Sequence, residues 1–201
     1  MGTNFSLTSD FSAASRKHTD DMKYLQELVR TVEGQTFLDT IPVYRPQDWG
    51  GHTESNCMSF AFHRDMRERL QPGMIGTGIK IGNKDRPKGL IDYVESVRRS
   101  LLSDNIPFLG DNLKDCVGRG VPAALFFLNN PSDEEDRDYH WVALRRTFNS
   151  ANGKYDTLIW ADKLGAKVSC CDPSPFFKVK LSHYNEFGGY YAVPPKLMLP
   201  S

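Results

Sequence analysis

Cys57 stands where a polar, glycine-containing stretch gives way to a run of apolar residues, and this position suits a nucleophilic thiol. The backbone N–H groups at the start of a helix are unpaired and carry partial positive charge. They stabilise a thiolate, and they can bind the oxyanion that forms when a thiolate attacks a carbonyl group. Cys57 is therefore a candidate nucleophile, provided that a base lies elsewhere in the chain.

The candidate base is His140, at the start of an alternating segment over residues 139–146 that predicts a β-strand. Without its context, a strand histidine is more often a core residue than a catalytic one. His140, Val142 and Leu144 fall on one face of the predicted strand. We expect the imidazole to point, with these apolar side chains, toward the helix that begins at Cys57.

The candidate orienting group is Asp162, which follows a returning hydrophobic strand over residues 155–161. A hairpin turn centred near Ala151 would place His140 opposite Asp162, and a slip of two or three residues would still leave them neighbours. Asp172 is a second candidate, although an Asp-Pro pair after a strand is more often a turn. The chain order Cys, His, Asp supplies a nucleophile, a base and a carboxylate that orients the base.

The alternative to an enzyme with these three catalytic residues is a non-catalytic protein-binding module. In that interpretation Cys57 and His140 are buried structural residues. The glycine-rich loop over residues 73–89 and the acidic loop over residues 129–138 then form a docking surface. Replacing Cys57 with serine would change the stability of such a module without a biological effect, and this separates the two hypotheses.

The elements that must position these residues are predicted from hydrophobic periodicity and from turn residues. Before the nucleophile, we expect a helix over residues 19–32 that ends at Gly34 and an extended loop over residues 37–51. After it, we expect helices over residues 57–70 and 90–103, and a short helical turn at residues 113–117.

The second half of the chain changes to strand patterns. The predicted strands, besides a short one at residues 78–81, cover residues 121–128, 139–146, 155–161 and 188–194. Helices followed by an antiparallel sheet make an α+β layout, in which the N-terminal helices pack on the sheet.

Composition limits both the domain count and the class of partner. The 201 residues are 39% hydrophobic, and 25 basic residues balance 25 acidic ones, so the formal net charge is zero. We expect one domain over residues 19–201 behind a mobile lead-in over residues 1–18. A net charge of zero does not indicate binding to nucleic acid. The sequence shows no segment long and apolar enough to cross a membrane.

The N-terminus lacks the pattern of a secretory signal peptide, so we expect a cytoplasmic protein or one exported by a signal-independent route. Gly2 matches the short N-myristoylation pattern, which also arises by chance. The four cysteines show no metal-ligand spacing, so we expect no metal and no other cofactor. They are Cys57, Cys116, Cys170 and Cys171.

The segments around the three candidate residues resemble the papain-like thiol hydrolases. The resemblance is carried by Asn56-Cys57, by the strand sequence over residues 139–142 and by Ala161-Asp162, in that chain order. It implies a papain-like α+β fold that attacks a carboxamide or peptide bond of a protein or peptide through an acyl-enzyme. Within the superfamily, the short chain is most similar to secreted bacterial effectors, namely glutamine deamidases and cell-wall amidases.

The chain departs from papain in the oxyanion hole. Papain has a glutamine six residues before the cysteine, and here that position is Gly51. The backbone N–H of Cys57 would need help from a side chain such as His52, Thr53 or Asn56. Trp49, together with Trp141 and Trp160, could line the substrate groove, although the last two could also cover the sheet.

Overall fold

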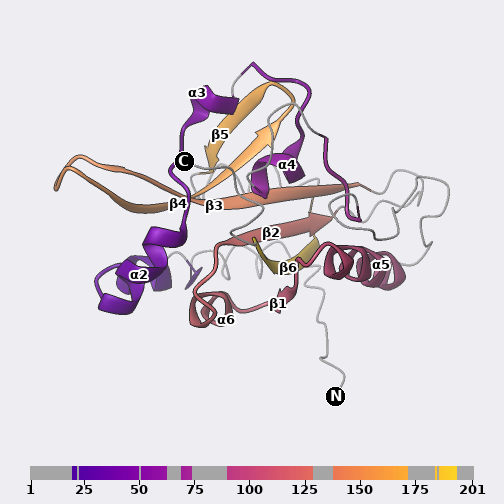
Figure 1. Ribbon diagram of the computed structural model, residues 1–201, viewed down its shortest axis with the longest axis horizontal. Helices are drawn as coiled ribbons and strands as arrows, with labels where there is room; N and C mark the ends of the chain where they lie inside the picture. Colours follow the sequence, from indigo (N-terminus) through magenta and orange to yellow (C-terminus); the bar gives the residue numbers. More distant parts are fainter. Residues whose placement is uncertain are drawn as a thin grey trace.

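The computed structural model describes residues 20–21, 23–49, 51–62, 69–73, 90–128, 138–171, 184 and 186–193. Within these ranges, antiparallel strands form one six-stranded sheet in the order β1-β6-β2-β3-β4-β5 (Figure 1). The strands are β1 (Phe108–Gly110), β2 (Ala123–Leu128), β3 (Tyr139–Asn149), β4 (Lys154–Leu164), β5 (Lys167–Cys171) and β6 (Glu186–Ala192).

Helices cover both faces of this sheet. They are α2 (Val32–Thr40), α3 (Pro46–Trp49), α4 (Cys57–Ala61), α5 (Leu90–Ser103) and α6 (Leu113–Gly118), preceded by helical turns within residues 20–28. Helices packed on an antiparallel sheet make the protein α+β, as the sequence predicts. Among the described residues, no helix has both the length and the apolar character needed to span a membrane.

Two hydrophobic clusters lie on opposite faces of the sheet. Val142 and Leu144 point into one cluster, which residues 20–28, α2 and α6 cover. Trp141 and Ala143 point into the other, which α4 and α5 cover. Figure 1 shows α4 beside β3, with α2 and α6 on the far side of that strand. The central strands are thus buried on both faces, which explains the nearly continuous apolar run of β2.

The prediction of one helix ending at Gly34 is wrong. The first helical segment ends near residue 28, and Thr31 caps a second helix, α2, by accepting a hydrogen bond from the Gly34 N–H at 3.0 Å. A Cβ atom at Gly34 would lie 1.8 Å from the carbonyl oxygen of Leu28. Glycine therefore permits close contact between the two helical segments instead of ending a helix.

Two further local predictions are wrong. The segment over residues 37–51 is not one extended loop, because α2 continues to Thr40 and Pro46 starts α3, where its missing N–H costs nothing. Helix α4 ends at Ala61, and residues 69–71 are not helical, so the predicted helix through residue 70 is too long. Residues 63–68 lie outside the described part of the chain.

Strands β2, β3, β4 and β6 correspond to the predicted strands over residues 121–128, 139–146, 155–161 and 188–194. Strands β1 and β5 were not predicted from the sequence. The lead-in with Gly2, the strand at residues 78–81 and Asp172 lie outside the described residues, as do both predicted docking loops apart from their end residues Gly73 and Asp138.

Candidate active site

Helix α4 starts at Cys57 because Asn56 caps it. The Asn56 Oδ1 atom accepts hydrogen bonds from the Ser59 N–H and from the Ser59 hydroxyl, each at 3.0 Å. Its Nδ2 atom donates to the Leu70 carbonyl at 2.7 Å, and the Leu70 N–H donates to the Ser59 hydroxyl at 3.1 Å. This closed network sets the helix start and leaves Cys57 half-buried at its first position.

His140 and Asp162 form a buried pair across two neighbouring strands. The His140 Nε2 atom lies 2.9 Å from the Asp162 Oδ2 atom, and both residues are 2% exposed. In the register, Asp162 is opposite Val142, two residues from the predicted partner. His140 and Asp162 are therefore diagonal neighbours on one face, a separation that an aspartate and an imidazole can bridge.

Cys57 lies near the same imidazole. A hydrogen bond and a charge interaction with Cys57 are among the causes that raise the pKa of His140. The structure thus brings the three candidate residues, from α4, β3 and β4, into one cluster.

The pKa of His140 records the balance of forces at this cluster. Burial is the largest influence and lowers the pKa, because a charged ring loses its hydration. The hydrogen bonds with Asp162 and Cys57, and the charges of both groups, act in the opposite direction and prevail, raising the pKa from 6.5 to about 9. The imidazolium form is therefore favoured at neutral pH, beside two groups that can carry negative charge.

The arrangement that brings His140 near Cys57 differs from the one that the sequence predicts. His140 alternates with Val142 and Leu144, but α4 packs on the opposite face, against Trp141. The contact arises at the ends of both elements, since His140 is the second residue of β3 and Cys57 the first of α4. His140 and Cys57 are near each other, as predicted, but they do not lie on the shared face that the sequence pattern predicts.

Tyr184 is a member of the site that sequence reasoning missed. Its ring stacks on His140, with the centroids 5.2 Å apart and the planes at 21°, and its hydroxyl donates to Asp138 Oδ2 at 3.0 Å. Burial and the Asp138 carboxylate raise the pKa of the Tyr184 hydroxyl. Tyr184 covers the imidazole and limits its contact with water. A lone tyrosine outside any periodic pattern gives no sequence signal for this role.

Arg145 holds the far end of the nucleophile helix. Its Nη2 atom donates to the Phe60 carbonyl at 2.6 Å, Nη1 donates to the Leu144 carbonyl at 2.9 Å, and the guanidinium lies 4.8 Å from the centre of the Phe60 ring. Complete burial lowers the pKa of Arg145 to about 9. A five-residue helix is too short to persist alone, so these bonds from β3 help to keep α4 in place.

The remaining predicted residues lie around the nucleophile in different settings. Trp49 is buried, with its ring 5.4 Å from the Phe60 ring in an edge-on arrangement, so it packs the core beneath α4. The His52 side chain is 41% exposed, and its Nδ1 atom lies 4.0 Å from Glu54 Oε2. The Asn56 amide is engaged in the helix cap described above. Roles for these three residues in oxyanion or substrate binding stay predictions.

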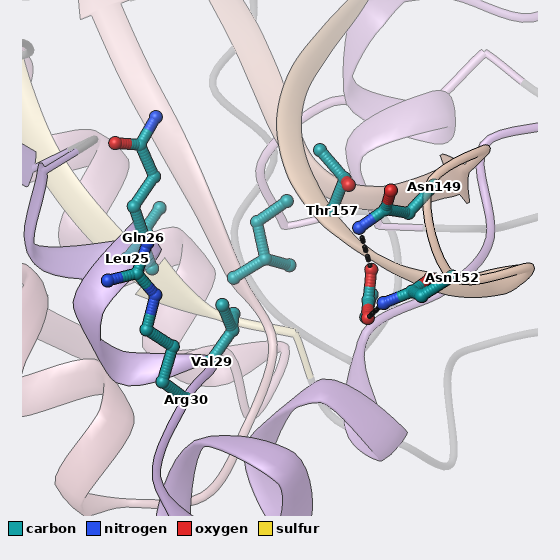
Figure 2. Close-up of a pocket in the computed structure, with 9 residues that line it drawn as sticks. Leu25, Gln26, Val29, Arg30, Asn149, Asn152 and Thr157 are labelled. Carbon is teal, nitrogen blue, oxygen red and sulfur yellow. Dashed lines mark hydrogen bonds between the residues drawn. The ribbon is translucent and has the colours of Figure 1, made fainter.

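A pocket of about 360 Å³ lies at the other end of the β3–β4 hairpin, away from this cluster (Figure 2). Arg30 and Gln26 stand on one side of it, and Asn149 and Asn152 stand on the other. Its lining does not include Cys57, so it is separate from the candidate active site.

Within the described part of the chain, no group of three or more His, Cys, Asp or Glu side chains could hold a metal ion. Comparison with protein families, with curated proteins and with solved structures finds no match.

Proposed function

We propose that the protein is a papain-like thiol hydrolase of amide bonds, with Cys57 as nucleophile, His140 as general acid and base, and Asp162 as the orienting carboxylate. One observation carries the proposal: a buried imidazole bonded to Asp162 at 2.9 Å also interacts with a half-buried thiol at the first position of a helix. Nucleophilic thiol chemistry needs a nucleophile, a general base beside it and a carboxylate that orients the base, and one residue is available for each of these roles.

The acylation step uses the thiolate and imidazolium forms together. The Cys57 sulfur attacks the amide carbonyl carbon, a C–S bond forms, and the carbonyl π electrons move onto oxygen. The backbone N–H of Cys57 is available to bind this oxyanion. When the intermediate collapses, the C–N bond breaks, and His140 gives its proton to the departing nitrogen. The products are ammonia or an amine and a thioester at Cys57.

Hydrolysis of the thioester returns the site to its first state. Neutral His140 takes a proton from water as the water oxygen attacks the thioester carbonyl. The C–S bond then breaks, and the carboxylic acid leaves, with Cys57 again a thiolate and His140 again protonated. Asp162 stays ionised and hydrogen-bonded throughout, which fixes the ring orientation and supports its positive charge.

The chemistry suits a side-chain carboxamide as well as a peptide bond, so the proposed class includes proteases, amidases and glutamine deamidases. The proposed substrate is a protein or peptide, as for the secreted effectors that the sequence resembles. The steps above need no metal or organic cofactor. Mass spectrometry of a treated target separates the possibilities, because deamidation changes an amide to an acid without a cut, whereas proteolysis divides the chain.

The direct test is the rate at which each cysteine reacts with iodoacetamide near neutral pH, read by peptide mapping. We expect Cys57 to react first, because it is half-buried beside the His140 imidazole, whereas Cys116 is buried in the core. Cys57→Ala should remove hydrolysis and keep the fold, and Cys116→Ala is the matched control that should keep hydrolysis. If Cys57 reacts no faster than Cys116, the result contradicts the proposed hydrolase and favours the binding module.

A further inference from the structure

Lys163 is a buried cation that the mechanism above does not use. It is 0% exposed, and its Nζ atom donates to the carbonyl oxygens of His52 at 2.7 Å, of Ser55 at 2.9 Å and of Gly165. A neutral amine has only two N–H donors, so three carbonyl acceptors require the ammonium form. Three hydrogen bonds to carbonyls are also what makes the burial of this charge tolerable.

These bonds hold the segment that leads into the nucleophile. His52 and Ser55 precede Cys57 by five and two residues, and Gly165 lies in the turn between β4 and β5. The same turn makes a second tie, because the Gly51 N–H donates to the Ala166 carbonyl at 2.9 Å. The loop over residues 51–55 is therefore bound at one end to the β4–β5 turn, through Gly51, and at the other end to Lys163 of β4, through Ser55.

Lys163 also acts on Cys57 through its charge. Burial lowers the pKa of Lys163, as does the nearby charge of Arg69, whereas Cys57 and Glu54 act to raise it. Cys57 and Lys163 therefore lie close enough for their charges to interact. His140 and Lys163 thus both lie near Cys57.

We propose that Lys163 is a positioning residue of the Cys57 site, which holds the loop before the nucleophile and supports the thiolate by its buried positive charge. This inference rests on the proposed function, since it gives Lys163 a part in nucleophilic thiol chemistry. Lys163 does not donate to Cys57 in the structure, and it acts through the His52 and Ser55 carbonyls and through its field. A lysine that served stability alone would leave the reactivity of a folded Cys57 unchanged.

The test compares Lys163→Met, Lys163→Arg and the wild type in the full-length protein. The second-order rate of iodoacetamide reaction at Cys57 is measured across the pH range, and circular dichroism reports the folded fraction. We expect Lys163→Met to slow the reaction at neutral pH by about tenfold or more. The midpoint of the plot of alkylation rate against pH should also move to higher pH, because a nearby positive charge is lost. Lys163→Arg should restore most of the rate.

Lys167→Met is the matched control, because it makes the same change at an exposed lysine four residues away. Its rate should equal that of the wild type. An unchanged rate and midpoint in folded Lys163→Met would overturn the proposal, even if the melting temperature falls. Should Lys163→Met not fold, Lys163→Gln against Lys163→Arg decides, since glutamine keeps N–H donors without charge. Equal rates in these two would exclude the electrostatic role.

The outcome for Lys163 is separable from that for the proposed function. The proposed function fails if wild-type Cys57 reacts no faster than Cys116. The role of Lys163 fails if the Cys57 rate does not depend on the charge at position 163, whatever the wild-type preference is. The two questions are thus answered by different comparisons within one set of rate measurements.

Discussion

The two ends of the β3–β4 hairpin contain similar residues in opposite environments. At the inner end, Asp162 bonds His140, and both are buried. At the outer end, which projects from the sheet in Figure 1, Asp156 accepts a hydrogen bond from Asn149 at 2.9 Å and another from Asn152. These bonds lower the pKa of Asp156, which is partly exposed, unlike the buried Asp162.

The difference lies in what surrounds each aspartate. The partners of Asp156 are four and seven residues away in a local turn, and Phe148 and Tyr155 beside it are about half exposed. The partner of Asp162 is 22 residues away, under Tyr184 and next to Cys57. Interactions between charges are strong where water is excluded and weak where it is not. Burial by distant segments therefore distinguishes the carboxylate of Asp162 from that of Asp156.

The largest expected effect comes from breaking the inner pair. Asp162→Ala should lower kcat/KM by about 10²- to 10⁴-fold, because His140 loses both its orientation and the charge that supports its proton. Asp162→Asn should fall between this variant and the wild type, since an amide can still hold the ring. The measurement is turnover of a chromogenic anilide or ester that the wild type hydrolyses.

The same variants should move the pH dependence. With a His140 pKa of about 9, wild-type activity should decline above roughly pH 9, as the proton for the leaving group is lost. Asp162→Asn removes a cause that raises this pKa, so the decline should begin at lower pH. NMR titration of the His140 ring reports the same shift without a substrate. A ring that titrates alike in both proteins would contradict the proposed pairing.

An intermediate effect is expected on stability. Because the pKa of His140 is raised from 6.5 to about 9 by folding, its contribution is fully present below pH 6.5 and is lost as the pH rises to about 9. At about 1.4 kcal/mol per pKa unit, the upper limit of that contribution is roughly 3 kcal/mol. Urea unfolding at about pH 6 and about pH 10 measures the change.

The comparison protein for this measurement is Asp162→Asn. Its free energy of unfolding should depend less on pH across the same interval, because the folded state then holds the His140 proton less tightly. Equal pH dependence in the two proteins would show that other groups account for the change in stability.

The smallest effect is expected at the outer end. Asp156→Ala removes hydrogen bonds to Asn149 and Asn152 in a partly exposed turn, so hydrolysis and the Cys57 alkylation rate should both stay at their wild-type values. These rates, measured beside those of Asp162→Ala, are the check. A large loss of activity in Asp156→Ala would show that the two ends of the hairpin are coupled, and would break the contrast drawn above.

Residue pattern alone predicted the main elements of the site. The alternation around His140, the hairpin turn and the return to Asp162 come from local periodicity, and the structure has the same two strands with a register shifted by two. Gly34 was misread because its role is a close contact with Leu28 from the preceding helix. Such a contact between two segments leaves no periodic trace in the sequence.

The sequence by itself determined the α+β order of elements and the chain positions of a thiol, an imidazole and a carboxylate, because these follow from side-chain type and local period. Only the tertiary structure decided that Asp162 is the carboxylate on His140, that Tyr184 covers the ring and that Lys163 holds the loop before Cys57. These contacts join segments 22 to 111 residues apart, and only packing of the whole chain can select them.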